Sequence, residues 1–172
     1  MTIAYADATA ADGPEVDAMA RESWVATFGH ASSADDLALY VAGAYGPTGR
    51  LLRDLADPAY RFRVAREDGR VAGYAKIGPY ALGEGLAPED TVQLYQLYVL
   101  PAWQGAGVSR ALMDWAVHAA RSGGAPAIAL SVWEENPRAL AFYRRYGFRE
   151  VGEYAFMTGN QADRDLVMRL DL

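Results

Sequence analysis

The segment Gln104-Gly-Ala-Gly107 has residue types and a spacing that could bind a ligand. It follows an apolar and aromatic run, residues 92–100, and precedes a stretch with helical periodicity. A strand that turns through glycines into a helix directs several backbone N–H groups, and the positive end of the helix dipole, at one spot. Such a spot suits a phosphate, so we predict an anion site built by residues 104–110.

Common nucleotide sites fit this segment poorly. A dinucleotide-binding turn has its glycines directly after the strand, whereas Pro101-Ala-Trp-Gln intervenes here, and it needs a small residue where this chain has Arg110. No Gly-Lys-Ser/Thr sequence occurs, which excludes a P-loop. The alternative without a ligand is a tight strand-to-helix turn that needs glycine only for its shape.

Composition excludes several other kinds of site. The chain has no cysteine, so a disulfide framework and a thiol nucleophile are excluded, and His30 and His118 do not form a metal-ligand spacing. A net charge of −6 argues against nucleic acid and is compatible with a small cationic substrate. No apolar run approaches the roughly 18 residues of a membrane span, and the N-terminus does not resemble a signal peptide. We therefore expect a cytoplasmic protein without metal.

Seven strands and five helices are expected to position these residues in one domain, 1–172. Predicted strands cover residues 2–7, 60–66, 71–80, 92–100, 127–133, 148–157 and 164–172, and predicted helices cover 12–29, 33–44, 51–55, the stretch from Gly107 to Ser122, and 136–146. Residues 92–100 are apolar on both faces, which predicts a central strand. The unit from 92 to 133 predicts a right-handed parallel crossover. The fold class is therefore a mixed α/β sheet with helices on its faces.

The run Leu97-Tyr-Val-Leu-Pro-Ala-Trp-Gln-Gly-Ala-Gly-Val-Ser-Arg-Ala-Leu112 resembles the acetyl-CoA motif of the GNAT N-acetyltransferase superfamily. Gln104 and Gly107 match that family's Arg/Gln-x-x-Gly-x-Gly/Ala pattern, and Ser109 stands where the family usually has Gly or Ala. A second family motif follows at residues 132–148, with Asn136, a Phe-Tyr pair and a Tyr-Gly-Phe ending. The resemblance covers most of residues 92–152. It implies a mostly antiparallel, twisted sheet of about seven strands, with a parallel pair splayed at the acetyl-CoA site.

The resemblance also implies site residues. Backbone groups of Leu97, Tyr98 and Val99 would pair with the pantetheine arm of acetyl-CoA, and Asn136 would contact its thiol end, although Asn136 serves equally well as a helix N-cap. The pyrophosphate would lie on Gln104, Gly105, Ala106, Gly107, Val108, Ser109 and Arg110.

Without cysteine, direct transfer in a ternary complex is the simplest mechanism. Tyr143 matches the tyrosine that commonly protonates the leaving thiolate in this family. Its reference pKa of about 10 is close to that of an alkyl thiol, which would make the proton transfer nearly balanced. A main-chain N–H near Tyr98 or Val99 could stabilise the oxyanion.

Residues 22–28 and the tail from Phe156 resemble bacterial polyamine (spermidine/spermine) N-acetyltransferases of the PaiA type. A polyamine acceptor could lie against Trp24, Phe28 and Trp133, with Gln96 holding a water. The general base stays open among three acidic residues, Glu22, Glu84 and Glu89. Other acceptors (antibiotic, amino-acid or protein amines) and a non-catalytic acyl-CoA sensor are the alternatives. An exposed last strand could pair in a homodimer.

Overall fold

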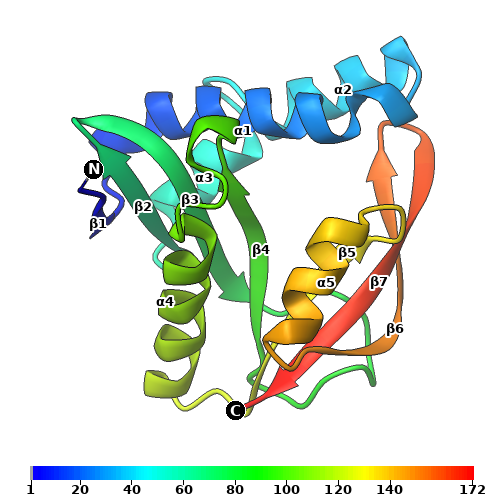
Figure 1. Cartoon of the computed structure of the whole chain (residues 1–172). Helices are drawn as coiled ribbons and strands as arrows, with labels where there is room; N and C mark the ends of the chain where they lie inside the picture. The colour runs from blue at the N-terminus through cyan, green and yellow to red at the C-terminus, as the bar shows by residue number, and fades with distance from the viewer. Residues whose placement is uncertain (1) are drawn as a thin grey trace.

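A computed structural model describes residues 2–172 and has one twisted sheet through the molecule (Figure 1). Over these residues the strand order is β1-β2-β3-β4-β5-β7-β6, and β4–β5 is the parallel pair. The strands are β1 (Ala4–Asp7), β2 (Arg61–Glu67), β3 (Arg70–Pro79), β4 (Val92–Val99), β5 (Ala127–Trp133), β6 (Arg149–Thr158) and β7 (Gln161–Asp171). The mixed, mostly antiparallel sheet expected from the sequence is confirmed, including the central position of β4.

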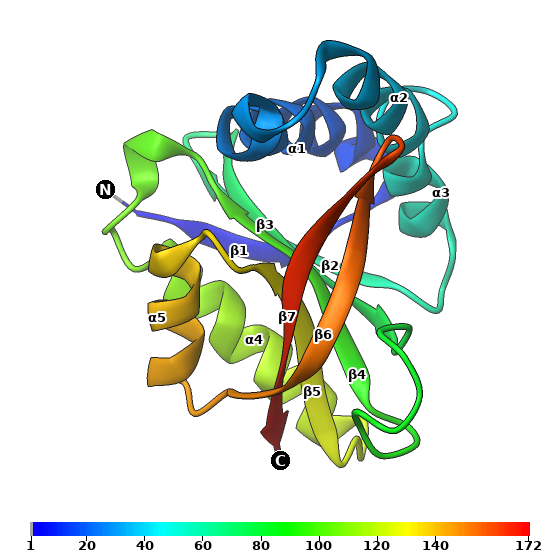
Figure 2. The same ribbon diagram turned by 90° about the vertical axis from the view of Figure 1, so that its right-hand side faces the viewer.

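The helices lie on both faces of this sheet (Figure 2). They are α1 (Gly13–Phe28), α2 (Ala34–Ala44), α3 (Arg50–Ala56), α4 (Val108–Ser122) and α5 (Pro137–Arg145), and short 3-10 turns cover Ala10–Asp12, Gly29–Ala31 and Pro101–Trp103. Helix α4 buries Leu112, Ala116 and Ala120, which recur every four residues and so share one helix face. Helices α1 and α3 pack in a separate core with Phe62, on the opposite face of the sheet.

Strands β4 and β5 separate after a short paired stretch. They pair only at Val92↔Ile128 and Gln93↔Ala129, whereas β4 pairs with β3 along its length. The register of β3 and β4 shifts at Tyr95, because Lys76 faces Gln96 while Ile77 faces Leu94. Such a bulge bends a strand and increases its twist. The open edge of β4 that results is the splay implied by the family resemblance.

The last strand is not the exposed edge that the sequence suggested. Strand β7 begins earlier than expected, at Gln161, and lies between β5 and β6, so β1 and β6 form the edges of the sheet over residues 2–172. A tight turn at Gly159-Asn160 joins β6 to β7. The tip of this hairpin contacts α2, where the Asn160 N–H donates to Asp36 Oδ1 at 2.8 Å. None of the helices in residues 2–172 has the length and apolar character needed to span a bilayer.

Candidate active site

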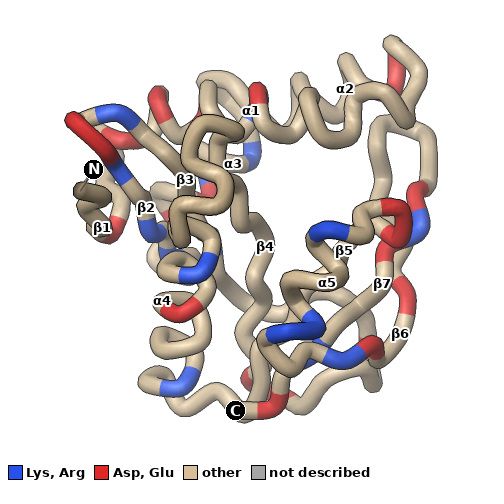
Figure 3. The backbone as a smooth tube through the Cα atoms, in the orientation of Figure 1, with Lys and Arg blue, Asp and Glu red and all other residues tan. Residues whose placement is uncertain are grey.

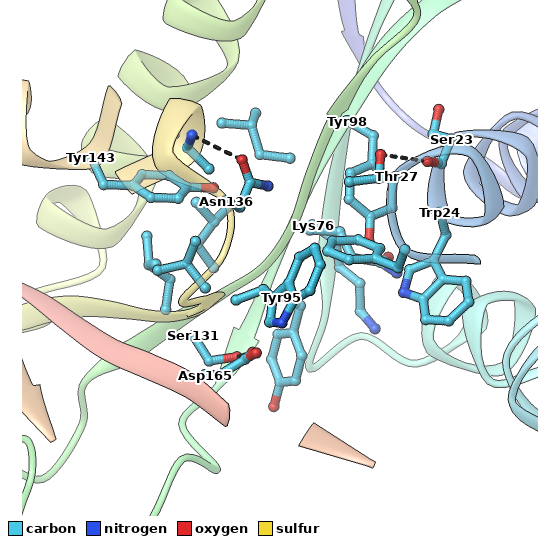
Figure 4. A pocket seen from close by; sticks show the side chains of 18 of the residues that line it. Ser23, Trp24, Thr27, Lys76, Tyr95, Tyr98, Ser131, Asn136, Tyr143 and Asp165 are labelled. Carbon is cyan, nitrogen blue, oxygen red and sulfur yellow. Dashed lines mark hydrogen bonds between the residues drawn. The ribbon is translucent and has the colours of Figure 1, made fainter. Parts of the chain in front are cut away.

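The splay between β4 and β5 opens into one cavity of about 720 Å³, between α1–α3, the separated strands and α5 (Figure 4). It extends from the glycine turn at residues 104–107 to the β6–β7 hairpin. The predicted site residues that line it are Trp24, Phe28, Gln96, Leu97, Tyr98, Val99, Gln104, Gly105, Gly107, Ser109, Arg110, Trp133, Asn136 and Tyr143. Of the predicted set, Ala106 and Val108 do not line it; the side chain of Val108 is fully buried in the core below α4.

The glycine turn depends on backbone conformations that favour glycine. Gly105 and Gly107 both have φ of +84°, and an added Cβ at either position would meet no neighbouring atom. Glycine is therefore favoured for its conformation and not for space. Gly107 is the N-cap of α4, and no side chain caps the helix there. The first N–H groups of α4, at Val108, Ser109 and Arg110, lack partners within the helix and can bind an anion.

The side chain of Gln104 stabilises this turn through two hydrogen bonds. Its Nε2 donates to the Val99 carbonyl at 3.1 Å, and its Oε1 accepts from Arg138 Nη1 at 2.5 Å. The backbone N–H of Gln104 donates to the Pro101 carbonyl at 3.2 Å, so Gln104 shapes the turn and leaves the phosphate to the N–H groups that follow. Arg110 lies in the first turn of α4 and Arg138 in the first turn of α5, and both line the cavity, so they add positive charge at this end. Figure 3 shows basic residues at the start of both helices.

The open edge of β4 presents only part of the backbone expected there. The Leu100 N–H donates to the Ala72 carbonyl at 2.9 Å, which directs Leu100, and by alternation Tyr98, toward β3. The main-chain groups of Leu97 and Val99 therefore face the splay. This corrects the expectation for Tyr98, whose backbone is used in the β3–β4 ladder and which reaches the cavity through its side chain.

Tyr143 lies on α5 with its hydroxyl directed into the cavity (Figure 4). Its ring packs against Phe142 and Phe148, with centroids 5.5 and 5.8 Å away. Burial raises the pKa of Tyr143 to about 12, so the phenol is protonated at neutral pH and can donate a proton. At the start of the same helix, Asn136 Oδ1 accepts from the Ala139 N–H at 3.2 Å. Asn136 is thus an N-cap that also lines the cavity.

Aromatic rings from several elements surround the far end of the cavity. Trp24 of α1 stacks on Tyr40 of α2 at 4.0 Å, and Phe28 contacts the edge of Trp133 at 5.9 Å. Trp24 is only 2% exposed, so its main role is packing between helices. Phe28 and Trp133 are more open. The Gln96 amide oxygen accepts from the Tyr74 hydroxyl at 2.9 Å.

These features place the chain among known proteins. Residues 18–148 match the model of the Acetyltransferase (GNAT) family. The chain belongs to the GNAT family. It is similar to an uncharacterised N-acetyltransferase of Mycobacterium tuberculosis, with 32% identity over 94% of this chain and 98% of that protein. The protein is therefore an N-acetyltransferase.

Two solved structures share the GNAT fold over the whole chain. The PaiA N-acetyltransferase of Thermoplasma acidophilum, in complex with coenzyme A, has a TM-score of 0.78 at 19% identity and covers both chains fully. The putative acetyltransferase yncA of Salmonella typhimurium, with its cofactor acetyl-CoA, has a TM-score of 0.75 at 20% identity, covering 100% of this chain and 95% of that one. At these identities the likeness concerns the fold.

The three acidic residues considered as a base in this GNAT enzyme lie elsewhere. Glu22, Glu84 and Glu89 are exposed, and none of them lines the cavity. The carboxylates that do line it are Asp54, Asp163 and Asp165. Among residues 2–172, no group of three or more His, Asp or Glu side chains could hold a metal ion.

Asp54 is neutralised within the protein. Its carboxylate accepts from Lys76, a residue that is only 4% exposed. The Lys76 ammonium lies 4.8 Å from the ring centroids of both Tyr60 and Tyr95. Burial lowers the pKa of Lys76, and the bond to Asp54 opposes this effect. The ion pair supports the wall of the cavity below the β4 bulge.

Asp165 is the buried carboxylate that the sequence reasoning missed. It lies in β7, is 6% exposed, and accepts from Ser131 Oγ at 2.8 Å. Burial raises its pKa to about 6, with a further contribution from nearby Asp163. A signal was present: an aspartate directly precedes the apolar run Leu166-Val-Met, at a strand position that alternation assigns to a buried face.

Proposed function

We propose that this N-acetyltransferase transfers the acetyl group of acetyl-CoA directly to a primary amine, with Tyr143 as general acid. The observation that carries the proposal is the single cavity, which joins the glycine turn, the open edge of β4, Tyr143 and the aromatic end. Both substrates can therefore be bound at once. Acetyl-CoA is the co-substrate, and no step requires a metal.

The cofactor lies along β4 in this proposal. The pantetheine arm takes the place of a paired strand and bonds to the main-chain groups of Leu97 and to the Val99 N–H, because the Val99 carbonyl already accepts from Gln104. The pyrophosphate lies at the N-terminus of α4, where unpaired N–H groups and the helix dipole favour negative charge. Arg110 and Arg138 supply countercharge at that end, and Asn136 lies beside the thioester.

The reaction proceeds in a ternary complex. The ammonium first loses a proton, and the amine nitrogen then attacks the thioester carbon, where a main-chain N–H at Leu97 or Val99 stabilises the oxyanion. The C–S bond breaks, and the thiolate takes the proton of the Tyr143 hydroxyl. The tyrosinate recovers a proton from the nitrogen, so one substrate proton ends on the CoA thiol and one in solvent. Burial in the cavity would raise the pKa of the CoA thiol, as it raises the pKa of the Tyr143 phenol, which keeps the proton transfer near balance.

The acceptor is a cationic alkylamine, and we infer a polyamine as its class. The cavity continues past Tyr143 into an aromatic end that contains the buried carboxylate of Asp165. Aromatic faces and carboxylates both attract ammonium groups. The likeness of residues 22–28 and of the tail to polyamine acetyltransferases supports the same class.

Three further predictions stay with this proposal. Residues 1–172 act as one catalytic domain, and the reaction takes place in the cytoplasm. A homodimer stays a prediction, and pairing through a sheet edge would have to use β1 or β6, because β7 is inside the sheet.

Incubation with acetyl-CoA and a panel of amines, followed by free-thiol detection, tests the function. The panel should include spermidine, an aminoglycoside, free amino acids and a peptide with a free N-terminus. We expect thiol release that depends on the amine and is fastest with spermidine. Tight acetyl-CoA binding without amine-dependent release would favour a non-catalytic sensor, and release with another amine alone would reject the polyamine.

A further inference from the structure

Asp165 has an unusual position for a charged side chain. It faces Trp133 across the β5–β7 ladder and lines the cavity, into which its carboxylate points (Figure 4). One oxygen, Oδ2, accepts the Ser131 hydroxyl, and the other accepts no hydrogen bond from residues 2–172. The carboxylate is thus held in one orientation with one oxygen left for a ligand.

No cation among residues 2–172 forms an ion pair with this carboxylate. The ion pairs among residues 2–172 include neither Asp165 nor Asp163. The ammonium of Lys76 is bonded to Asp54. Asp163 accepts from Thr158 and Gln161 at 2.8 and 2.6 Å, so neutral groups satisfy it. A carboxylate buried without a cation is unfavourable, and a cationic ligand would remove that cost.

The groups that act on Asp165 are neutral or acidic, because Arg50, a cation that also lines the cavity, interacts with Tyr40 and not with Asp165. They are Ser131 of β5, Tyr98 of β4, Tyr40 of α2 and Asp163 of β7 itself. The Tyr98 phenol is within electrostatic reach of both Asp165 and Tyr143, and burial, followed by these neighbours and Tyr40, raises the pKa of Tyr98. Asp165 therefore lies on the acceptor side of the cavity, which Tyr143 also lines.

We propose that Asp165 binds an ammonium group of the acceptor, with Ser131 fixing the carboxylate. This makes Asp165 the residue that selects cationic amines over neutral ones. The inference rests on the proposed function, because the bound amine is an acceptor only if the protein transfers an acetyl group to it. Its direct test is a binding measurement that does not depend on turnover.

The test compares Asp165→Asn with wild type and with Asp163→Asn as matched control. Asparagine keeps the shape and the bond to Ser131 but removes the charge. The control removes the same charge two residues away, from a carboxylate that is already satisfied. Binding of 1,4-diaminobutane to CoA-saturated protein is measured by calorimetry. We expect about 30-fold weaker binding or more in Asp165→Asn, and less than about 3-fold weaker binding in Asp163→Asn.

A second measurement separates recognition from general structural damage. Turnover of methoxyamine, which is uncharged at neutral pH, should change less than about 3-fold in Asp165→Asn, and acetyl-CoA affinity and melting temperature should not fall. A Ser131→Ala variant, which frees the carboxylate, should weaken diamine binding to an intermediate degree.

Three results would overturn the inference: no diamine binding by wild type, equal binding by Asp165→Asn, or an equal loss in Asp163→Asn. A loss of kcat at unchanged diamine affinity would also overturn it and assign Asp165 as a proton acceptor. Diamine binding that needs Asp165, without acetyl transfer to any amine, would reject the proposed function and keep the inference.

Discussion

At the scale of single residues, two buried charges in the cavity wall have different kinds of partner. The Lys76 ammonium is paired with Asp54 and surrounded by aromatic rings, whereas the Asp165 carboxylate has one neutral hydrogen bond. The Lys76–Asp54 pair stabilises the folded cavity wall. The Asp165 carboxylate lowers the stability of the folded protein, and it leaves a negative charge that can bind a ligand. Substitutions at the two positions should therefore have opposite effects on stability.

Asp165→Asn should stabilise the protein at neutral pH. The folded-state pKa of Asp165 is about 6, above the unfolded value near 3.9, so the folded protein holds the proton more tightly. The stability from this proton is fully present below about pH 4 and is lost as the pH rises through 6. The variant should gain up to roughly 3 kcal/mol in free energy of unfolding at pH 7, and little at pH 4. Urea unfolding at both pH values measures this, and a less stable variant at pH 7 would indicate a structural role.

Lys76→Met should destabilise the protein, because it leaves Asp54 partly buried without its cation. We expect a loss of about 3–5 kcal/mol in free energy of unfolding. The double variant Lys76→Met/Asp54→Asn is the control and should recover part of the loss, since the unpaired charge is removed as well. Thermal and urea unfolding of the three proteins give the coupling energy, and a coupling near zero would contradict the pairing.

At the scale of elements, local sequence patterns predicted most of the secondary structure. Alternation identified the strands near their observed ends, and the Asn136-Pro137 start of α5 is an N-cap as expected. The bulge at Tyr95 and the early start of β7 escaped prediction, because both depend on which strand lies next to which. Asp165 was missed for a related reason. Alternation in the local sequence assigns Asp165 to a buried face, whereas its place in the cavity wall depends on the pairing of β7 with β5, which the local sequence does not show.

The β6–β7 hairpin places Asp163 and Asp165, and its tip fits closely against α2. A Cβ on Gly159 would lie 2.6 Å from the Asp36 Cα, and Gly159 also has φ of +61°. Gly159→Ala should therefore displace the tip, weaken diamine binding and lower stability by about 2 kcal/mol or more. Gly69→Ala is the control: φ is +82° there and no atom lies near the added Cβ, so only about 1 kcal/mol is expected.

Equal losses of stability in the two glycine variants, with unchanged diamine binding, would show that the contact between the hairpin and α2 does not shape the acceptor end. Differential scanning calorimetry and titration with 1,4-diaminobutane provide the comparison. Acetyl-CoA affinity should be the same in both variants, because the glycine turn lies at the other end of the cavity.

At the scale of the whole molecule, the site lies where the sheet opens. Two separate cores, one under α4 and one under α1 and α3, pack on opposite faces of the sheet, and β4 and β5 diverge after their short paired stretch. Charge is distributed to match two substrates. The chain is acidic overall, whereas Arg110 and Arg138 lie at the cofactor end and Asp165, which has no ion-pair partner among residues 2–172, lies at the acceptor end. The arrangement suits an anionic cofactor and a cationic acceptor.

The most direct test of the central claim is amine-dependent thiol release by Tyr143→Phe, compared with wild type at saturating acetyl-CoA. The substitution removes only the hydroxyl that is proposed to protonate the thiolate. We expect a kcat at least about ten-fold lower, with unchanged acetyl-CoA affinity and unchanged 1,4-diaminobutane binding. Equal kcat in the two proteins would contradict this expectation.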